Sequence, residues 1–149
     1  MVNYDQFMDF MKKYFEDYSQ YAQDEATMPR MDKYWTEDIQ VTAYFQLEGG
    51  DYPFRMTTRR EWQDFLIKGH LTIWENLQPI DLMVDTRQLK ATSMLKVVKF
   101  DRKTDKELVN LDGIGYYTLV ETDEGNLCIK SLDFFTGDAS TFTKLYTMK

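Results

Sequence analysis

The chain has 149 residues, and its 25 acidic and 18 basic side chains give a formal net charge of −7. That length predicts one domain over residues 1–149, with a core large enough to need no disulfide or structural metal. The acidic charge disfavours nucleic-acid partners, and one cysteine and one histidine exclude Cys-rich or His-rich metal sites, so no cofactor is expected. No apolar run approaches the roughly 20 residues of a membrane span, and the N-terminus lacks a signal-peptide pattern. We therefore expect a cytoplasmic protein with no membrane partner.

The first predicted helix covers residues 3–26. Its apolar side chains recur at three- and four-residue steps, and Asn3 with Gln6 forms a capping pair at its start. Four tyrosines belong to this apolar stripe, namely Tyr4, Tyr14, Tyr18 and Tyr21. A buried tyrosine needs a partner for its hydroxyl group, so the stripe indicates a polar interior or a cavity.

Two shorter helices are predicted after it. Residues 28–35 contain Pro29, which suits a first helical turn. Residues 58–68 open with a Thr58–Glu61 capping box, and Gly69 then fits the left-handed position that follows many helices.

The remaining segments have the β-branched and aromatic character of strands. A strand is expected at 39–47, a turn at Glu48–Asp51 and a short edge strand at 52–56. Four longer strands joined by short turns should form an antiparallel meander, at 71–84, 88–100, 107–121 and 126–136. Pro79 predicts a bend or bulge in the first of these four. Helices followed by long antiparallel strands indicate an α+β fold.

This order of elements resembles the nuclear-transport-factor-two-like superfamily, in particular its SnoaL-like branch. Three segments are similar to those of the family: the strand entry Tyr34–Val41, the hairpin Gly113–Ile129 and the small-residue triplet Ala91–Ser93. The resemblance implies three N-terminal helices packed on a strongly curved antiparallel sheet, forming a cone with an internal pocket. It further implies a hydrophobic small-molecule ligand and a homodimer formed through the outer face of the sheet, where Met94, Ile114 and Tyr116 are expected.

Strand alternation predicts which side chains face the pocket. In 126–136, Asp133 continues the apolar face of Leu127, Ile129 and Ser131, so it becomes the candidate general acid or base. In 71–84, Ile80, Leu82 and Val84 suit the core, and continuing backward places Trp74, Asn76 and Gln78 on the same face. A bulge at Pro79 would instead shift this register by one residue.

Candidate site residues follow from these faces and from the resemblance. Tyr18 lies about where ketosteroid isomerase has its oxyanion-stabilising tyrosine, and Asn76 lies where many SnoaL-like proteins have an inward histidine. The resemblance and the alternation add the expected pocket lining of Tyr14, Trp35, Trp74, Ser93, Gly115, Tyr117 and Ser131. Tyr18 and Trp35 also fit plain core positions, Asp133 also fits a solvated strand end, and His70 fits either a base at the pocket mouth or a solvated loop residue.

Two functions therefore remain open. One is a cofactor-independent lyase, isomerase or cyclase acting on a hydrophobic small molecule, with Asp133, Tyr18 and Asn76 as its catalytic residues. The other is a non-catalytic ligand-binding or protein-association domain of the same fold. Ala43 and Gly115 stand where ketosteroid isomerase has its base and its oxyanion-hole acid, so that particular activity is not expected.

Overall fold

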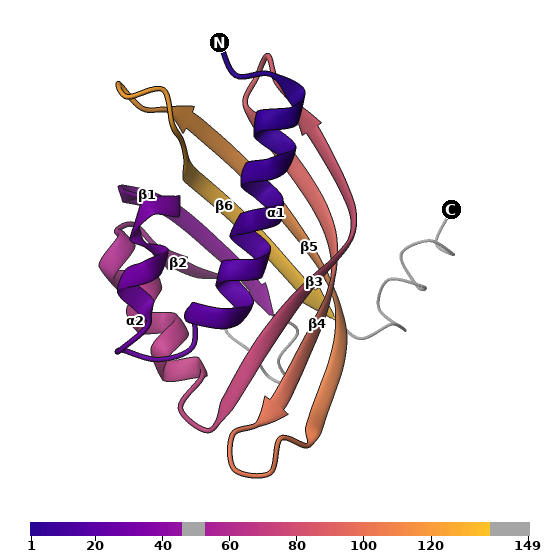
Figure 1. Cartoon of the computed structure of the whole chain (residues 1–149). Coiled ribbons are helices and arrows are strands. Elements are labelled where there is room, and N and C mark those ends of the chain that lie inside the picture. Colours follow the sequence, from indigo (N-terminus) through magenta and orange to yellow (C-terminus); the bar gives the residue numbers. More distant parts are fainter. Residues whose placement is uncertain (46–52, 138–149) are drawn as a thin grey trace.

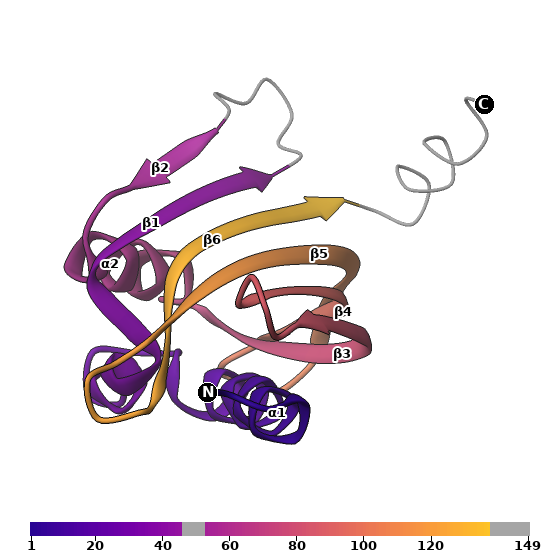
Figure 2. The ribbon, with the colours of Figure 1, turned by 90° about the horizontal axis from the view of Figure 1, so that it is seen from above.

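The computed structural model describes residues 1–45 and 53–137. Its elements are α1 (Tyr4–Tyr21), the 3-10 helix η1 (Met28–Tyr34), β1 (Trp35–Phe45), β2 (Phe54–Met56), α2 (Arg59–Gly69), β3 (Ile73–Asp85), β4 (Lys90–Asp101), β5 (Glu107–Glu121) and β6 (Leu127–Gly137). The strands form one curved sheet that wraps around α1, with α2 beside β1 (Figures 1 and 2). The predicted α+β class, with helices on a curved sheet, is confirmed.

The sheet has the strand order β2-β1-β6-β5-β4-β3. Strands β3 to β6 pair antiparallel with their sequence neighbours, which confirms the predicted meander. The expectation of a wholly antiparallel sheet is wrong at one place, because β1 pairs parallel to β6, with Val41 opposite Leu132. The connection from β1 to β6 passes through β2, α2 and strands β3 to β5, so no tight turn forces these two strands to run in opposite directions.

Helix α1 begins where the capping pair predicts. The Asn3 side chain accepts from the Gln6 backbone N–H, and the Gln6 side chain accepts from the Asn3 backbone N–H. The helix ends at Tyr21, earlier than predicted, and the following carbonyl groups of Ala22 and Gln23 accept side-chain hydrogen bonds from His70 and Arg102. Tertiary hydrogen bonds therefore replace the last predicted helical turn.

The shorter elements lie close to their predicted places. Thr58 caps α2 by accepting from the Glu61 backbone N–H. Gly69 is the last residue of α2 and has no positive φ, so the left-handed position predicted for it is wrong, and the chain leaves the helix at His70 with φ −110°. Strand β1 begins at Trp35, four residues before the predicted strand. The turn predicted at Glu48–Asp51 lies outside the described residues.

The core centres on aromatic rings that α1 packs against the sheet. Tyr14 makes edge-on or tilted ring contacts, with centroids 5.4–6.2 Å away, to Phe15, Tyr18, Tyr34, Trp35 and Tyr117. Gly115 lies beside this cluster, and a Cβ there would lie 2.4 Å from the Tyr117 hydroxyl oxygen. The core therefore requires glycine at position 115 for the room that the Tyr117 ring occupies.

Within residues 1–45 and 53–137, no helix is both long and apolar enough to cross a bilayer.

Candidate functional site

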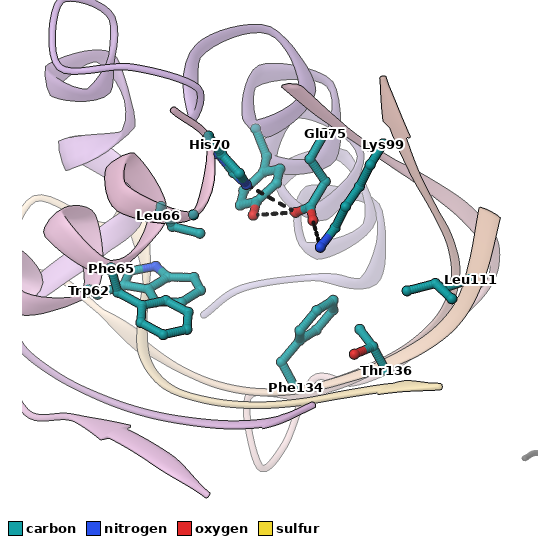
Figure 3. A pocket seen from close by; sticks show the side chains of 11 residues that line it. Trp62, Phe65, Leu66, His70, Glu75, Lys99, Leu111, Phe134 and Thr136 are labelled. Carbon is teal, nitrogen blue, oxygen red and sulfur yellow. Dashed lines mark hydrogen bonds and ion pairs between the residues drawn. The ribbon is translucent and has the colours of Figure 1, made fainter. Parts of the chain in front are cut away.

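A pocket of about 190 Å³ opens between α1, α2 and the concave face of the sheet. Figure 3 shows its side chains converging from these elements. Its described lining consists of Tyr18, Trp62, Phe65, Leu66, Gly69, His70, Glu75, Lys99, Leu111, Phe134 and Thr136. Aromatic and aliphatic side chains form most of the wall, and the titratable groups gather on one side of it, an arrangement typical of small-molecule sites.

Glu75 is the centre of the polar side. Its side chain is 8% exposed, and its carboxylate accepts a 2.8 Å hydrogen bond from the Tyr18 hydroxyl. The Lys99 ammonium lies 3.7 Å from Glu75 Oε2, and His70 Nε2 lies 3.8 Å from Glu75 Oε1 (Figure 3). A carboxylate this deeply buried is stable only with partners of this kind, since desolvating a lone charge costs several kcal/mol.

A β-bulge in β3 turns Glu75 toward the pocket. Pro79 pairs with Leu95 and Asp81 pairs with Met94, so Ile80 is the extra residue on β3. The predicted bulge near Pro79 is thus confirmed, while the predicted face is wrong, because Ile80 is 60% exposed and Glu75 and Leu77 are buried instead. The shift of one residue moves every side chain before the bulge to the opposite face.

Asn76 and Trp74 consequently lie on the other face from Glu75. Asn76 lines a separate groove with Lys12 and Glu16 of α1, and Trp74 packs on Phe100 with ring centroids 5.1 Å apart. Neither residue belongs to the described lining of the Glu75 pocket. The expectation that they face the same cavity as the core of β3 is therefore wrong.

Two polar side chains, Ser19 of α1 and Gln23 just after its end, hold the backbone of β3 in place. Gln23 accepts from the Glu75 backbone N–H at 2.9 Å and donates to the Glu75 carbonyl at 2.8 Å, so its amide acts as a neighbouring strand would. The Ser19 hydroxyl accepts from the Leu77 N–H at 3.0 Å. These bonds satisfy an edge strand that would otherwise expose unpaired backbone groups, and they fix Glu75 relative to Tyr18 in α1.

His70 is buried at the end of α2, so the solvated-loop alternative is wrong. Its Nδ1 lies 2.9 Å from the Ala22 carbonyl, which can only accept, so Nδ1 carries the proton. The neutral ring then leaves Nε2 as a free lone pair facing the pocket and Glu75. Burial lowers the pKa of His70 below its ordinary value, and the Glu75 charge opposes that shift.

Arg102 and Tyr18 make the remaining polar contacts around Glu75 and His70. The Arg102 guanidinium donates to the carbonyls of His70 and Ile73 at 2.7 and 2.8 Å and also to the Gln23 carbonyl, which ties the segments just after α1 and α2 to the start of β3. Burial, together with the neighbouring Glu75 charge, raises the pKa of Tyr18 well above its ordinary value. Tyr18 therefore stays protonated and acts as a hydrogen-bond donor throughout the neutral pH range.

A second bulge, in β6, removes Asp133 from the concave face. Thr118 pairs with Ser131 and Leu119 pairs with Ile129, so Lys130 is the extra residue. Leu132 and Phe134 are buried after it, and Asp133 shares the convex face with its cross-strand partner Tyr116, which is 37% exposed. The inward placement predicted for Asp133 and Ser131 is wrong, because the alternation was counted through this bulge.

The other predicted lining residues belong to the packed core. Trp35, Tyr14 and Tyr117 are buried in the aromatic cluster, Ser93 is fully buried with its hydroxyl on the Asp81 carbonyl, and Gly115 faces the Tyr117 ring. The predicted inward face of β5 is confirmed, since Gly113, Gly115, Tyr117 and Leu119 are all buried there. Of the ten predicted site residues, Tyr18 alone is among the described lining of the Glu75 pocket.

No group of three or more His, Cys, Asp or Glu side chains within residues 1–45 and 53–137 is arranged to hold a metal ion. The side chains of the pocket themselves offer a neutral imidazole that can accept a proton, a carboxylate beside it, and phenol and ammonium donors.

Known structures share this architecture across almost the whole chain. A proposed polyketide cyclase from Xanthomonas campestris pv. campestris has a TM-score of 0.64 at 15% identity, covering 95% of this chain and 96% of its own. A proposed SnoaL-like polyketide cyclase from Shewanella putrefaciens has a TM-score of 0.64 at 12% identity, covering 97% and 98%. The chain has the nuclear-transport-factor-two-like fold.

The same fold occurs in the BvnE pinacolase of Penicillium brevicompactum, with a TM-score of 0.62 at 15% identity over 97% of this chain and 93% of the other. No protein-family model and no curated protein matches the sequence. The similar structures confirm the nuclear-transport-factor-two-like fold predicted from the resemblance.

The residues that sequence reasoning missed are Glu75, Lys99 and the buried position of His70. Two of them carried a signal. The bulge expected at Pro79 moves Glu75 inward once it is applied, and the inward series Leu95–Val97 in β4 continues to Lys99. The burial of His70 had no local signal, because it depends on the Ala22 carbonyl of α1, 48 residues away.

Proposed function

We propose that the pocket binds a hydrophobic small molecule and carries out cofactor-independent acid–base chemistry on it, as a lyase, isomerase or cyclase. The observation that carries the proposal is the cluster of the buried Glu75, Tyr18 and His70 with the half-buried Lys99 on one side of an otherwise apolar pocket. Titratable groups gathered in this way are characteristic of active sites. The polyketide cyclases and the pinacolase that share the fold agree with this reaction class.

The geometry assigns a role to each group. His70 Nε2 accepts a proton from the substrate, because its Nδ1 is already held by the Ala22 carbonyl. The imidazolium so formed lies 3.8 Å from the Glu75 carboxylate, which stabilises the new positive charge. The Lys99 ammonium then stabilises negative charge that develops on a substrate oxygen, while the Tyr18 hydroxyl stays on the Glu75 carboxylate. Proton return from His70 to another substrate atom completes an isomerisation or an elimination.

A ligand screen followed by an exchange assay tests this proposal. Purified protein is screened by thermal shift against hydrophobic ketones, phenols, steroids and terpenoids, and each hit is incubated in deuterium oxide. A ligand at about 100 times its dissociation constant adds roughly 2.7 kcal/mol of stability. We expect deuterium to enter a hit at an acidic C–H position, and Glu75→Gln and His70→Gln to slow that exchange at least tenfold.

Asp133→Asn is the matched control. It makes the same carboxylate-to-amide change as Glu75→Gln on the opposite face of the sheet, so exchange should remain at the wild-type rate. Exchange lost in Asp133→Asn and retained in Glu75→Gln would contradict the assignment. Hits that bind without any exchange would favour a non-catalytic binding domain.

We propose separately that the chain forms a homodimer through the convex face of the sheet. Aromatic side chains are partly exposed there, and Phe135 stacks on Tyr44 with ring centroids 4.5 Å apart and lies beside Ile114. Apolar groups gathered on one face commonly mark an interface. Light scattering after gel filtration should show a dimer, and Phe135→Glu should dissociate it. Leu71→Glu is the control and should leave the dimer intact, because Leu71 lies in the turn before β3 and is 72% exposed. A monomeric wild-type chain would refute the proposal.

A further inference from the structure

We infer that the pocket takes a neutral compound of about one ring that carries a hydroxyl group, a ligand class much smaller than a steroid or a fused polyketide. This inference rests on the proposed function, because it names the substrate class of the same pocket. Three properties of the pocket carry it: its volume, its charge balance and its unsatisfied acceptor.

The volume sets the size of the ligand. The pocket holds about 190 Å³. A cavity of about 150 Å³ accommodates benzene, and pockets for drug-sized ligands occupy about 300–1,000 Å³. One substituted ring therefore fills the space. Phe65 and Phe134 close the apolar side opposite the polar cluster, so a second and third fused ring meet aromatic side chains (Figure 3).

The charge balance favours a neutral ligand. The titratable groups of the described lining are the Glu75 carboxylate, the Lys99 ammonium, the Tyr18 hydroxyl and the neutral His70 ring, so one negative and one positive charge offset each other. An anionic ligand that approached Lys99 would also lie close to Glu75. A cationic ligand that approached Glu75 would meet Lys99, only 3.7 Å away from that carboxylate.

The free acceptor defines the polar group of the ligand. His70 Nδ1 is bonded to the Ala22 carbonyl, and no described residue donates a hydrogen bond to Nε2. Tyr18 already donates to Glu75, so it does not satisfy Nε2. A ligand hydroxyl can donate to Nε2 and accept from the Lys99 ammonium with the same oxygen. An ether or a hydrocarbon of the same size cannot make the first of these bonds.

His70 is the only histidine of the chain, so its ring signals identify themselves in a nuclear magnetic resonance spectrum. Protein labelled with 15N at histidine is titrated at neutral pH with phenol, anisole, benzoate, benzylamine and 9-phenanthrol. Without ligand, the spectrum should show the tautomer protonated at Nδ1. Phenol should shift the Nε2 resonance saturably, and anisole should bind about fivefold to tenfold more weakly because it lacks the donor.

Variants test the size limit independently. 9-Phenanthrol should not shift His70 in the wild type, and Phe65→Ala should admit it by removing a ring from the pocket wall. Phe10→Ala is the matched control, because Phe10 is also a half-buried phenylalanine of a helix and lies outside the described lining. The size limit is wrong if 9-phenanthrol binds the wild type as tightly as phenol does, and the proposed function then still stands.

Three further outcomes overturn the ligand class. Tighter binding of benzoate or benzylamine than of phenol would refute the neutral ligand. A His70 spectrum that no compound of the panel changes would refute the one-ring class, and the broader screen and deuterium exchange described above would decide the proposed function separately. Equal binding of phenol and anisole would refute the hydroxyl requirement.

Discussion

The hydrogen bond between Tyr18 and Glu75 allows a quantitative test of the polar cluster. Tyr18→Phe removes the hydroxyl that donates at 2.8 Å to a buried carboxylate and leaves the ring in its place. A hydrogen bond to a charged group contributes about 1.5–3 kcal/mol to stability. A domain of this size loses roughly 2–4 °C of melting temperature for each kcal/mol. The variant should therefore melt about 3–12 °C below the wild type in a thermal denaturation measured by circular dichroism.

A double-mutant cycle separates this bond from general packing effects. Glu75→Gln keeps an acceptor for Tyr18 and removes the charge. The two hydrogen bonds of the Gln23 side chain are unaffected, because they are made to the backbone of residue 75. The coupling free energy of Tyr18→Phe with Glu75→Gln should then be about 1 kcal/mol, the difference between a charged and a neutral hydrogen bond. Tyr117→Phe is the control, since among the described residues its hydroxyl makes no hydrogen bond, and it should change stability by less than about 1 kcal/mol. A coupling within about 0.3 kcal/mol of zero would refute the bond.

Three further predictions concern the same site and its supporting core. Because the pKa of His70 is lowered in the folded state, the contribution of the neutral ring to the free energy of unfolding is complete above pH 6.5. This contribution is lost as the pH falls below 6.5, by up to about 1.4 kcal/mol per pH unit. His70→Gln should abolish this pH dependence in urea unfolding measured at pH 5–7. Glu75→Gln should lower the pKa of His70 further, because it removes the charge that opposes the effect of burial, and an unchanged titration of the single histidine resonance would contradict the contact between them. Gly115→Ala should destabilise the chain by about 1–3 kcal/mol, because its Cβ meets the Tyr117 ring, whereas Gly69→Ala, with open space around it in α2, should stabilise it by about 0.5–1 kcal/mol in the same unfolding assay.

The sequence predicts the elements of this fold far better than it predicts their faces. The capping pair at Asn3 and the cap at Thr58 each act within four residues, so local chemistry places both helix starts correctly. The antiparallel meander follows from short turns between long strands. The β1–β6 pairing has no such local signal, because it joins segments about 90 residues apart.

The faces of β3 and β6 were mispredicted for one physical reason. Alternation assigns faces by counting, and a single extra residue reverses every assignment beyond it. Lys130 in β6 moved Asp133 to the convex face, and Ile80 in β3 moved Glu75 to the concave face. Pro79 made the β3 bulge predictable, whereas Lys130 of the β6 bulge is an ordinary strand residue that gives no such warning.

The burial of Glu75 is the feature that separates this pocket from the surrounding core. A leucine at position 75 would pack against α1 without desolvating a charge, and replacing buried ion pairs with apolar side chains often leaves stability unchanged or raises it. The chain instead holds a carboxylate there and surrounds it with Tyr18, His70 and Lys99, while Gln23 fixes its backbone. Stability alone does not account for so many polar groups around one buried charge. The proposed function, which recognises a polar group on an apolar ligand and moves a proton on it, does require them.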